Sequence, residues 1–216
     1  MEQESSLSSL LHESSAEIGF PLKSEQVQLF MAYLKQLQTW NQSFNLTRIL
    51  VNEEIVIKHF VDSLAALTAT DIEVGSRLLD VGTGAGFPGI PLKIVRPDLR
   101  VTLLEPAKKK SSFLHFIVGL LRLETVDIYN ITLDRFIGMQ QVKKSFDYIT
   151  TRALNPALVL RAGTKVVRQG GGAILYSSQS IEKSYDFTEW QLINEHTFDL
   201  PGDYGHRTIS IFSLAS

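Results

Sequence analysis

The sequence contains no cysteine among its 216 residues. Disulfide bonds, thiolate nucleophiles, cysteine-ligated zinc and iron–sulfur clusters are therefore excluded as functional devices. Histidine is also scarce: the five histidines, at positions 12, 59, 115, 196 and 206, show no spacing typical of metal ligands. We therefore expect a protein without a metal site.

A surplus of positive charge is likewise missing. Lys and Arg number 21 against 23 for Asp and Glu, a formal net charge of −2, so a polyanion would have to meet a local basic patch. No apolar run approaches the roughly 18 residues of a membrane span, and the N-terminus lacks the basic and apolar regions of a signal peptide. We expect a soluble, cytoplasmic protein of ordinary domain size that makes no membrane contact.

The hydrophobic periodicity changes near residue 75, which divides the chain into residues 1–74 and 75–216. The first part has apolar residues at helical spacing, and Ser24 and Asn52 are plausible N-caps of two of its helices. We expect residues 1–74 to form a helical N-terminal part that packs on a domain formed by residues 75–216.

The second part alternates short β-branched runs with helical stretches, the pattern of βαβ units in a parallel sheet. The expected strands are Arg77–Val81, Arg100–Leu104, Val126–Asn130, Phe146–Thr151 and Gly172–Ser177, with helices that include Ser111–Leu121 and Leu133–Val142. Two further strands, Trp190–Leu200 and Arg207–Leu214, are separated by too few residues for a crossover helix, so they should form an antiparallel hairpin. An α/β sheet of about seven strands with this ending is typical of class I, Rossmann-like S-adenosylmethionine-dependent methyltransferases.

The loop after the first strand carries the sharpest signal. Glycines at 82, 84 and 86 allow a tight turn and close approach of a ligand to the backbone. Residues 84–89 also match the dinucleotide pattern G-x-G-x-x-G, but that match starts two residues late and places Pro88 inside the loop. The frame that begins at Asp80 instead resembles the methyltransferase loop that holds the methionine end of the cofactor.

Two acidic residues follow the next strands. Glu105 ends the second strand, where a carboxylate can accept both hydroxyl groups of a ribose, in NAD enzymes as well as in methyltransferases. Asp134 follows the third strand, where this fold class contacts the adenine amine. An almost equally plausible interpretation of Asp134 is an exposed residue in the first turn of a helix.

Three motifs together resemble the GidB/RsmG family. They are Trp40-Asn-Gln-Ser-Phe-Asn-Leu-Thr47, Lys58-His-Phe-Val-Asp-Ser-Leu64 and Leu79-Asp-Val-Gly-Thr-Gly-Ala-Gly-Phe-Pro-Gly-Ile-Pro-Leu92. The resemblance runs from about Ser24 to the last strand. It implies a bacterial enzyme that transfers a methyl group from S-adenosylmethionine to guanine N7 in the 530 loop of 16S ribosomal RNA, as naked RNA or in the small ribosomal subunit. We expect the protein to be a monomer.

The resemblance also implies a set of cofactor contacts. Together with the residues singled out above, the expected cofactor-binding set is Asp80, Gly82, Thr83, Gly84, Gly86, Phe87, Glu105, Leu133, Asp134 and Arg152. His59 and Asp62 lie three residues apart on one helix face and match the family's His-x-x-Asp-Ser. With Arg152 they are the candidates for a catalytic role. The alternative for His59 and Asp62 is a hydrogen bond between helix and domain that takes no part in chemistry.

The expected RNA contacts are the row Lys108, Lys109 and Lys110 and, before the last strand, Arg207. Three consecutive lysines can also be a solvated helix start. The chain departs from the family at Thr132, where an Arg is usual, and at Ser177-Ser178, where Lys-Gly is usual. Both departures remove positive charge from the expected RNA face.

The expected chemistry agrees with what the sequence lacks. Guanine N7 carries a free lone pair and the sulfonium is already activated, so catalysis can rest on positioning without a general base. Two alternatives stay open: a catalytically weak, cofactor-binding module associated with the ribosome, and a methyltransferase for another RNA or a small molecule.

Overall fold

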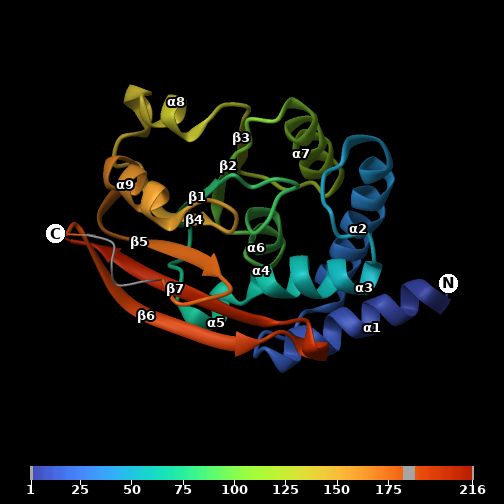
Figure 1. Ribbon diagram of the computed structural model, residues 1–216. Helices are drawn as coiled ribbons and strands as arrows, with labels where there is room; N and C mark the ends of the chain where they lie inside the picture. The colour runs from blue at the N-terminus through green and yellow to red at the C-terminus, as the bar shows by residue number, and fades with distance from the viewer. Residues whose placement is uncertain (1, 182–187, 216) are drawn as a thin grey trace.

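The computed structural model describes residues 2–181 and 188–215, and a seven-stranded sheet runs through its centre (Figure 1). The strands are β1 (Arg77–Val81), β2 (Arg100–Leu104), β3 (Val126–Tyr129), β4 (Phe146–Thr151), β5 (Val167–Ser177), β6 (Trp190–Asp199) and β7 (His206–Leu214). Their order is β3-β2-β1-β4-β5-β7-β6. The first five strands are parallel, and β7 is antiparallel to both β5 and β6. The predicted sheet and its terminal hairpin are confirmed.

Helices cover both faces of the sheet. They are α1 (Glu2–Glu17), α2 (Ser24–Phe44), α3 (Asn52–Ile55), α4 (Asp62–Leu64), α5 (Ala66–Ala69), α6 (Gly89–Val95), α7 (Lys108–Leu120), α8 (Leu133–Ile137) and α9 (Pro156–Val166). A π-helical segment (Val56–Val61) joins α3 to α4, and two short 3₁₀ turns cover Gln140–Val142 and Pro201–Asp203.

Alternation along the strands divides the core into two clusters. On β1, Leu78 belongs to the cluster that contains the N-terminal helices, α6 and α7, whereas its neighbour Leu79 belongs to the cluster with α8 and α9. Successive strand residues point to opposite faces, so both faces of the parallel strands are apolar. The N-terminal helices therefore share one core with the sheet.

Several predicted boundaries are corrected. Ser24 and Asn52 are the first helical residues, not the caps; the N-caps are Lys23 and Val51, and the side chain of Gln26 accepts the hydrogen bond of the Lys23 N–H group. The helix expected over 111–121 begins at 108, and the one expected over 133–142 breaks at Gly138 into α8 and a 3₁₀ turn. The fifth strand begins at Val167, well before its predicted start.

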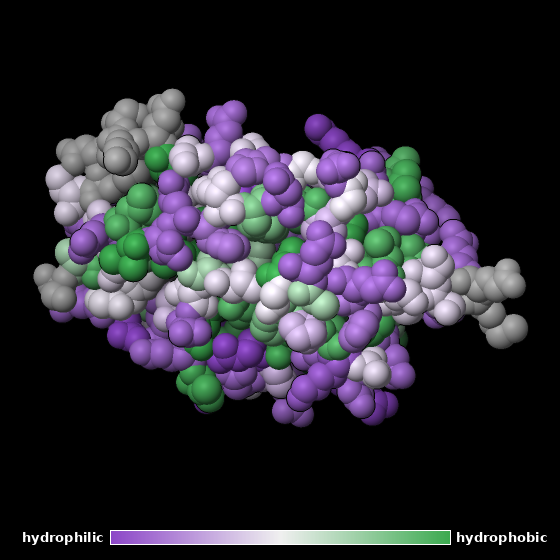
Figure 2. Space-filling model, turned by 90° about the horizontal axis from the view of Figure 1, so that it is seen from below, coloured by the Kyte–Doolittle hydropathy of each residue, from purple (hydrophilic) through white to green (hydrophobic). Residues whose placement is uncertain are grey.

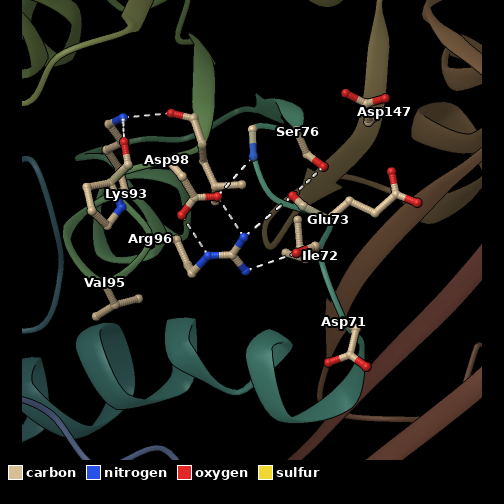
Figure 3. A network of polar contacts seen from close by, with 12 residues as sticks. Asp71, Ile72, Glu73, Ser76, Lys93, Val95, Arg96, Asp98 and Asp147 are labelled. Atoms are coloured by element: carbon tan, nitrogen blue, oxygen red, sulfur yellow. Dashed lines mark hydrogen bonds and ion pairs between the residues drawn. The ribbon is translucent and has the colours of Figure 1, made fainter.

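A network of polar contacts closes the amino-terminal edge of the sheet (Figure 3). Arg96, after α6, makes two hydrogen bonds to the Asp98 carboxylate, of 2.8 and 2.7 Å, and a third of 3.0 Å to the carbonyl oxygen of Ile72. The buried Lys93 ammonium donates to the carbonyl oxygens of Pro97 and Leu99 at 2.7 and 2.6 Å. These contacts tie the segment before β1 to the turn before β2.

The outer face next to α1 and β6 is seen from below in Figure 2. Hydrophobic residues form small separate groups there, interspersed with hydrophilic ones. Among the described residues no helix is long and apolar enough to cross a membrane.

Candidate functional site

The glycine loop leaves β1 at the carboxyl-terminal edge of the sheet. The strand order reverses between β2-β1 and β4, so this loop lies at the topological switch point, where open α/β sheets bind ligands. Gly82, Gly84 and Gly86 have φ values of +68°, +63° and +111°, which L residues with a side chain rarely adopt. A Cβ on Gly84 would meet no atom within 4 Å, so the loop presents bare backbone to open space at that point.

Asp80 and Thr83 hold this loop from within. Both are buried, and Asp80 Oδ2 accepts hydrogen bonds from Thr83 Oγ1 at 2.6 Å and from the Gly89 N–H group at 2.8 Å. The other oxygen, Oδ1, has no hydrogen-bond partner among the described residues. Burial raises the pKa of Asp80 to about 7, against the lowering effect of its two hydrogen bonds.

Glu105 connects the loop to β2. One carboxylate oxygen accepts from the Gly84 N–H group at 2.9 Å and the other from the Ala107 N–H group at 2.8 Å. The structure therefore brings the second expected acidic residue directly to the glycine loop. Leu133 and Asp134 begin α8, the first buried and the second exposed.

Arg152, which follows β4, joins the two helix residues expected beside the site. Its Nη1 donates to Asp62 Oδ2 at 3.1 Å and to the Lys58 carbonyl oxygen at 2.9 Å, and its Nη2 lies 2.6 Å from His59 Nδ1. The guanidinium also lies 5.4 Å from the ring centroid of Phe87 in the glycine loop. One arginine thus connects the N-terminal helices to the glycine loop.

The environment of His59 fixes its protonation. A guanidinium only donates, so Nδ1 accepts from Arg152, and Nε2 carries the hydrogen that is donated to Thr47 Oγ1 at 2.9 Å. Burial, followed by the charge of Arg152, lowers the pKa of His59 to about 3. The ring stacks on Phe87 with centroids 4.4 Å apart. His59 is therefore a neutral ring that orients Arg152 and Phe87.

Asp62 is the other partner of Arg152. It is 2% exposed, and burial raises its pKa although Arg152 and Arg207 lie nearby. Arg207 Nε lies 3.4 Å from Asp62 Oδ1, an ion-pair distance, but Oδ1 has no hydrogen-bond partner among the described residues. One oxygen of this buried carboxylate is left without a donor.

A cavity of about 290 Å³ opens beside this cluster. Its lining is Ile49, Lys58, His59, Asp62, Arg152, Tyr176, Ser177, Ser178 and Arg207. Three cations and one carboxylate around a space of this size suit a polar, electron-rich ligand. The structure brings together His59, Asp62 and Arg152, the candidates for a catalytic role, with Arg207, which the sequence predicted as an RNA contact.

The three lysines lie elsewhere. Lys108, Lys109 and Lys110 form the first turn of α7, on the chain just after Glu105, and do not line the cavity. Lys109 Nζ lies 5.5 Å from the ring centroid of Phe44 at the end of α2.

Tyr33 and Tyr176 were missed by sequence reasoning. The buried Tyr33 hydroxyl donates to the Ala85 carbonyl oxygen in the glycine loop, and the buried Tyr176 hydroxyl donates to the Ser63 carbonyl oxygen at 2.7 Å. Tyr33 lies three residues after Phe30 in the apolar stripe of α2, and a polar tip on a core-facing position is the signal that could have identified it. Among the described residues no group of three or more His, Asp and Glu side chains could hold a metal ion.

Solved structures define the fold class. The chain is similar to the crystal structure of MtNAS in complex with MTA and tNA, with a TM-score of 0.60 and 16% identity over 100% of this chain and 88% of that one. It is also similar to TrmN from Thermus thermophilus, with a TM-score of 0.56 and 14% identity over 71% of this chain and 48% of that one. The fold is that of the class I, Rossmann-like methyltransferases.

Sequence comparison then gives the family. The model of the GidB family, described as rRNA small subunit methyltransferase G, matches residues 26–200, and the chain belongs to this family. The ribosomal RNA small subunit methyltransferase G of Caldanaerobacter subterraneus subsp. tengcongensis is 38% identical over 82% of this chain and 74% of its own length. That of Carboxydothermus hydrogenoformans is 33% identical over 91% of this chain and 87% of its own length. The predicted family is confirmed.

Proposed function

We propose that this protein transfers a methyl group from S-adenosylmethionine to N7 of a guanine in the 530 loop of 16S ribosomal RNA, acting as a cytoplasmic monomer. The observation that carries the proposal is the contact between two neighbouring sites. Phe87 belongs to the glycine loop and stacks on His59, which lines the polar cavity. A methyl donor in the loop and an acceptor in the cavity would therefore lie next to each other.

The residues of the loop fit the proposed cofactor. Gly84 offers open backbone, and Glu105 and Gly82 lie beside it, while the exposed Asp134 follows the adjacent strand. When bound, S-adenosylmethionine supplies an activated methyl group on a sulfonium. Within this frame, we infer that Asp80 and Thr83 shape the loop, since both are buried.

The cavity residues would hold the acceptor base without exchanging protons. His59 is neutral at physiological pH because its pKa is about 3, and N7 attack needs no base. Catalysis then rests on proximity and orientation, which can contribute roughly 7–11 kcal/mol. Asp62 Oδ1, which lacks a hydrogen-bond partner among the described residues and lies 3.4 Å from Arg207 Nε, can accept an N–H group from the Watson–Crick edge of guanine, the edge by which flipped bases are usually read.

A second function is supported by one observation. Ser177 and Ser178 line the cavity where the family usually has Lys-Gly, and Thr132 is exposed where an Arg is usual. The loss of two charges weakens attraction to RNA phosphates. A cofactor-binding, ribosome-associated module with little turnover is therefore the alternative.

The cofactor is tested with a matched pair of glycines. Gly84→Ala should abolish most of the increase in melting temperature that S-adenosylmethionine produces, because the new Cβ stands in the open space at the loop. Gly170→Ala is the control: Gly170 has a similar φ of +70° and also no neighbour within 4 Å, but lies in β5. An equal shift with NAD, or an undiminished shift in Gly84→Ala, would contradict the proposal.

The reaction is tested by mapping 7-methylguanine in ribosomal RNA through borohydride and aniline cleavage. Cleavage in the 530 loop should disappear when the gene is deleted and return with the wild-type protein. Unchanged modification after deletion would favour the module. Methyl incorporation that survives RNase treatment of the substrate pool would favour a small-molecule substrate.

A further inference from the structure

A cluster of aromatic rings on α2 and α7 is not part of the site described above. Trp40 lies between Phe44 and Phe116, with ring centroids 5.3 and 5.2 Å from its own. The indole rests on the buried Phe113 at 5.5 Å. Phe44 and Phe116 are 37% and 39% exposed, so two phenyl rings on a half-buried support face solvent. We call Trp40, Phe44 and Phe116 the aromatic platform.

Positive charge adjoins the aromatic platform. Lys109 Nζ lies over the Phe44 ring. Lys108 and Lys110 are the sequence neighbours of Lys109 in the first turn of α7. No acidic residue occupies that turn, although the positive end of a helix dipole favours carboxylates and disfavours cations. A lysine row at this position therefore opposes helix stability, and a negatively charged partner would reverse that cost.

The sequence around the platform is free of acidic residues. Residues 26–52, which contain α2 from its third residue and the following loop, have no Asp or Glu, and neither do residues 106–123, which contain α7. The Lys and Arg residues in these two stretches are Lys35, Arg48, Lys108, Lys109, Lys110 and Arg122. In a chain with a net charge of −2 the row Lys108, Lys109 and Lys110 beside the platform is a local basic patch.

The platform is linked to the cavity by a short loop. Phe44 ends α2, and Ile49, a few residues later, lines the cavity. A stretch of about five residues spans at most about 18 Å, so a strand of RNA with one base in the cavity can reach the platform with a neighbouring segment.

We propose that the aromatic platform, with the lysine row, binds single-stranded RNA by stacking unpaired bases on Phe44 and Phe116 beside the cavity. Exposed rings with basic neighbours are the arrangement by which proteins hold single strands without reading their sequence. The proposal rests on the proposed function for its substrate, and extends it by giving the RNA a second contact outside the reaction site. Stacking on the aromatic platform and the charge of the lysine row supply RNA affinity that the uncharged Thr132 and Ser177 do not.

The test measures binding of the full-length protein to a twelve-nucleotide oligo(A) and to an abasic ribose-phosphate strand of equal length. The double variant Phe44→Ala/Phe116→Ala should weaken oligo(A) binding about 5- to 150-fold for each base that is stacked. It should leave binding of the abasic strand unchanged. Phe44→Tyr/Phe116→Tyr should retain the wild-type affinity because the ring faces remain.

Leu158→Ala is the matched control, since Leu158 is 48% exposed on α9, on the other face of the sheet. Replacing Lys108, Lys109 and Lys110 with Gln should instead reduce the slope of log K against log salt, by about 0.7 for each phosphate that is no longer neutralised. The alanine double variant should keep that slope. Thermal unfolding establishes that the variants remain folded.

Equal affinity of wild type and the alanine double variant for oligo(A) would overturn the proposal. Two other results would also overturn it. One is that the alanine double variant loses binding only to the assembled small subunit, which would indicate a ribosomal protein as the partner. The other is that the wild-type protein binds anionic vesicles but does not bind oligo(A). Methyl transfer distinguishes the two levels. If the protein stacks oligo(A) but transfers no methyl group to ribosomal RNA, the proposed function is rejected and the platform is not. If the protein transfers methyl groups and the double variant keeps the wild-type KM and the wild-type affinity for oligo(A), only the platform is rejected.

Discussion

Two arginine–carboxylate pairs lie at opposite edges of the sheet, and they differ in how fully the carboxylate oxygens are hydrogen-bonded and in the direction in which the carboxylate pKa is shifted. At the amino-terminal edge Arg96 holds both oxygens of Asp98, and the Gly75 N–H group adds a further hydrogen bond of 3.1 Å. The Arg96 guanidinium lowers the pKa of Asp98 to about 2. At the carboxyl-terminal edge Arg152 holds one oxygen of Asp62, the other oxygen lacks a donor among the described residues, and burial raises the pKa.

The difference separates a structural ion pair from one held ready for a ligand. Asp98 has its hydrogen bonds satisfied by the protein, so its charge stabilises the fold. Asp62 is desolvated, and its second oxygen has only Arg207 at 3.4 Å without a hydrogen bond, which costs stability and leaves an acceptor for a partner from outside. Perturbed carboxylates of the second kind cluster at functional sites.

Replacing each arginine should give the largest effects. Arg152→Ala leaves Asp62 and His59 without their shared donor, so we expect methyl transfer to fall at least about 100-fold and the free energy of unfolding to fall by about 3–5 kcal/mol, as for a broken buried pair. Arg96→Ala should lower stability but keep kcat/KM of the remaining folded protein. Denaturant unfolding and single-turnover kinetics check both. If Arg96→Ala loses activity while fully folded, the two edges are not functionally distinct.

Replacing each carboxylate should give smaller, opposite effects. Asp98→Asn should lower the free energy of unfolding by about 1.5–3 kcal/mol, because charge-assisted hydrogen bonds to Arg96 are removed. Asp62→Asn should leave stability unchanged or raise it, since the burial that raises the pKa of Asp62 outweighs its pairing with Arg152 and Arg207. Methyl transfer by Asp62→Asn should fall about 10- to 100-fold, the cost of about one hydrogen bond to the base. A stability loss in Asp62→Asn as large as that in Asp98→Asn would contradict the comparison.

The smallest expected effect is a difference between the two edges in how the free energy of unfolding depends on pH. The pKa of Asp98 is lowered to about 2, so its contribution is present above about pH 4 and is lost as the pH falls toward 2. The pKa of Asp80 is raised to about 7, so its contribution is full below about pH 4 and is lost as the pH rises through 7. Each proton contributes a slope of at most about 1.4 kcal/mol per pH unit.

Urea unfolding at about pH 5 and about pH 8 measures the second window. The wild-type protein should lose more stability from the lower to the higher pH than Asp80→Asn does. The comparison is between the two proteins because His59, whose pKa is lowered to about 3, acts in the opposite direction in both. Between about pH 4 and about pH 2, the free energy of unfolding of Asp98→Asn should fall less than that of the wild-type protein. A wild-type stability that rises across the upper window by an amount unaffected by Asp80→Asn would show that burial does not raise the pKa of Asp80.

The sheet could be predicted because its signals are local. Short β-branched runs bounded by turn residues predicted the strand positions, and the missing crossover before β7 predicted the antiparallel ending. Asn155 followed by Pro156 is a local N-cap signal of the same kind, and the Asn155 side chain accepts from the Ala157 N–H group at 2.9 Å. The break at Gly138 was not predicted, because a helix end without a strong cap leaves little trace in the sequence.

The candidate site could be predicted only as a set of separate residues. The sequence singled out His59, Asp62 and Arg152, but not that one guanidinium bonds to both other side chains, because 90 or more residues separate Arg152 from its partners. The π-helical turn over Val56–Val61, which contains His59, follows no sequence signal that we recognise. The protonation state of His59 depends on its burial and its neighbours, which are properties of the packed structure.

The hydroxyl of Tyr33 has a consequence for how the protein responds as a whole. It bonds from α2 to the carbonyl oxygen of Ala85, which lies 52 residues later in the chain, and a Cβ on Gly86 would come within 2.6 Å of it. A ligand that orders the glycine loop must therefore also restrain α2. Amide hydrogen exchange in α2 should slow when the cofactor binds, so the helical segment reports occupancy of a site it does not contain.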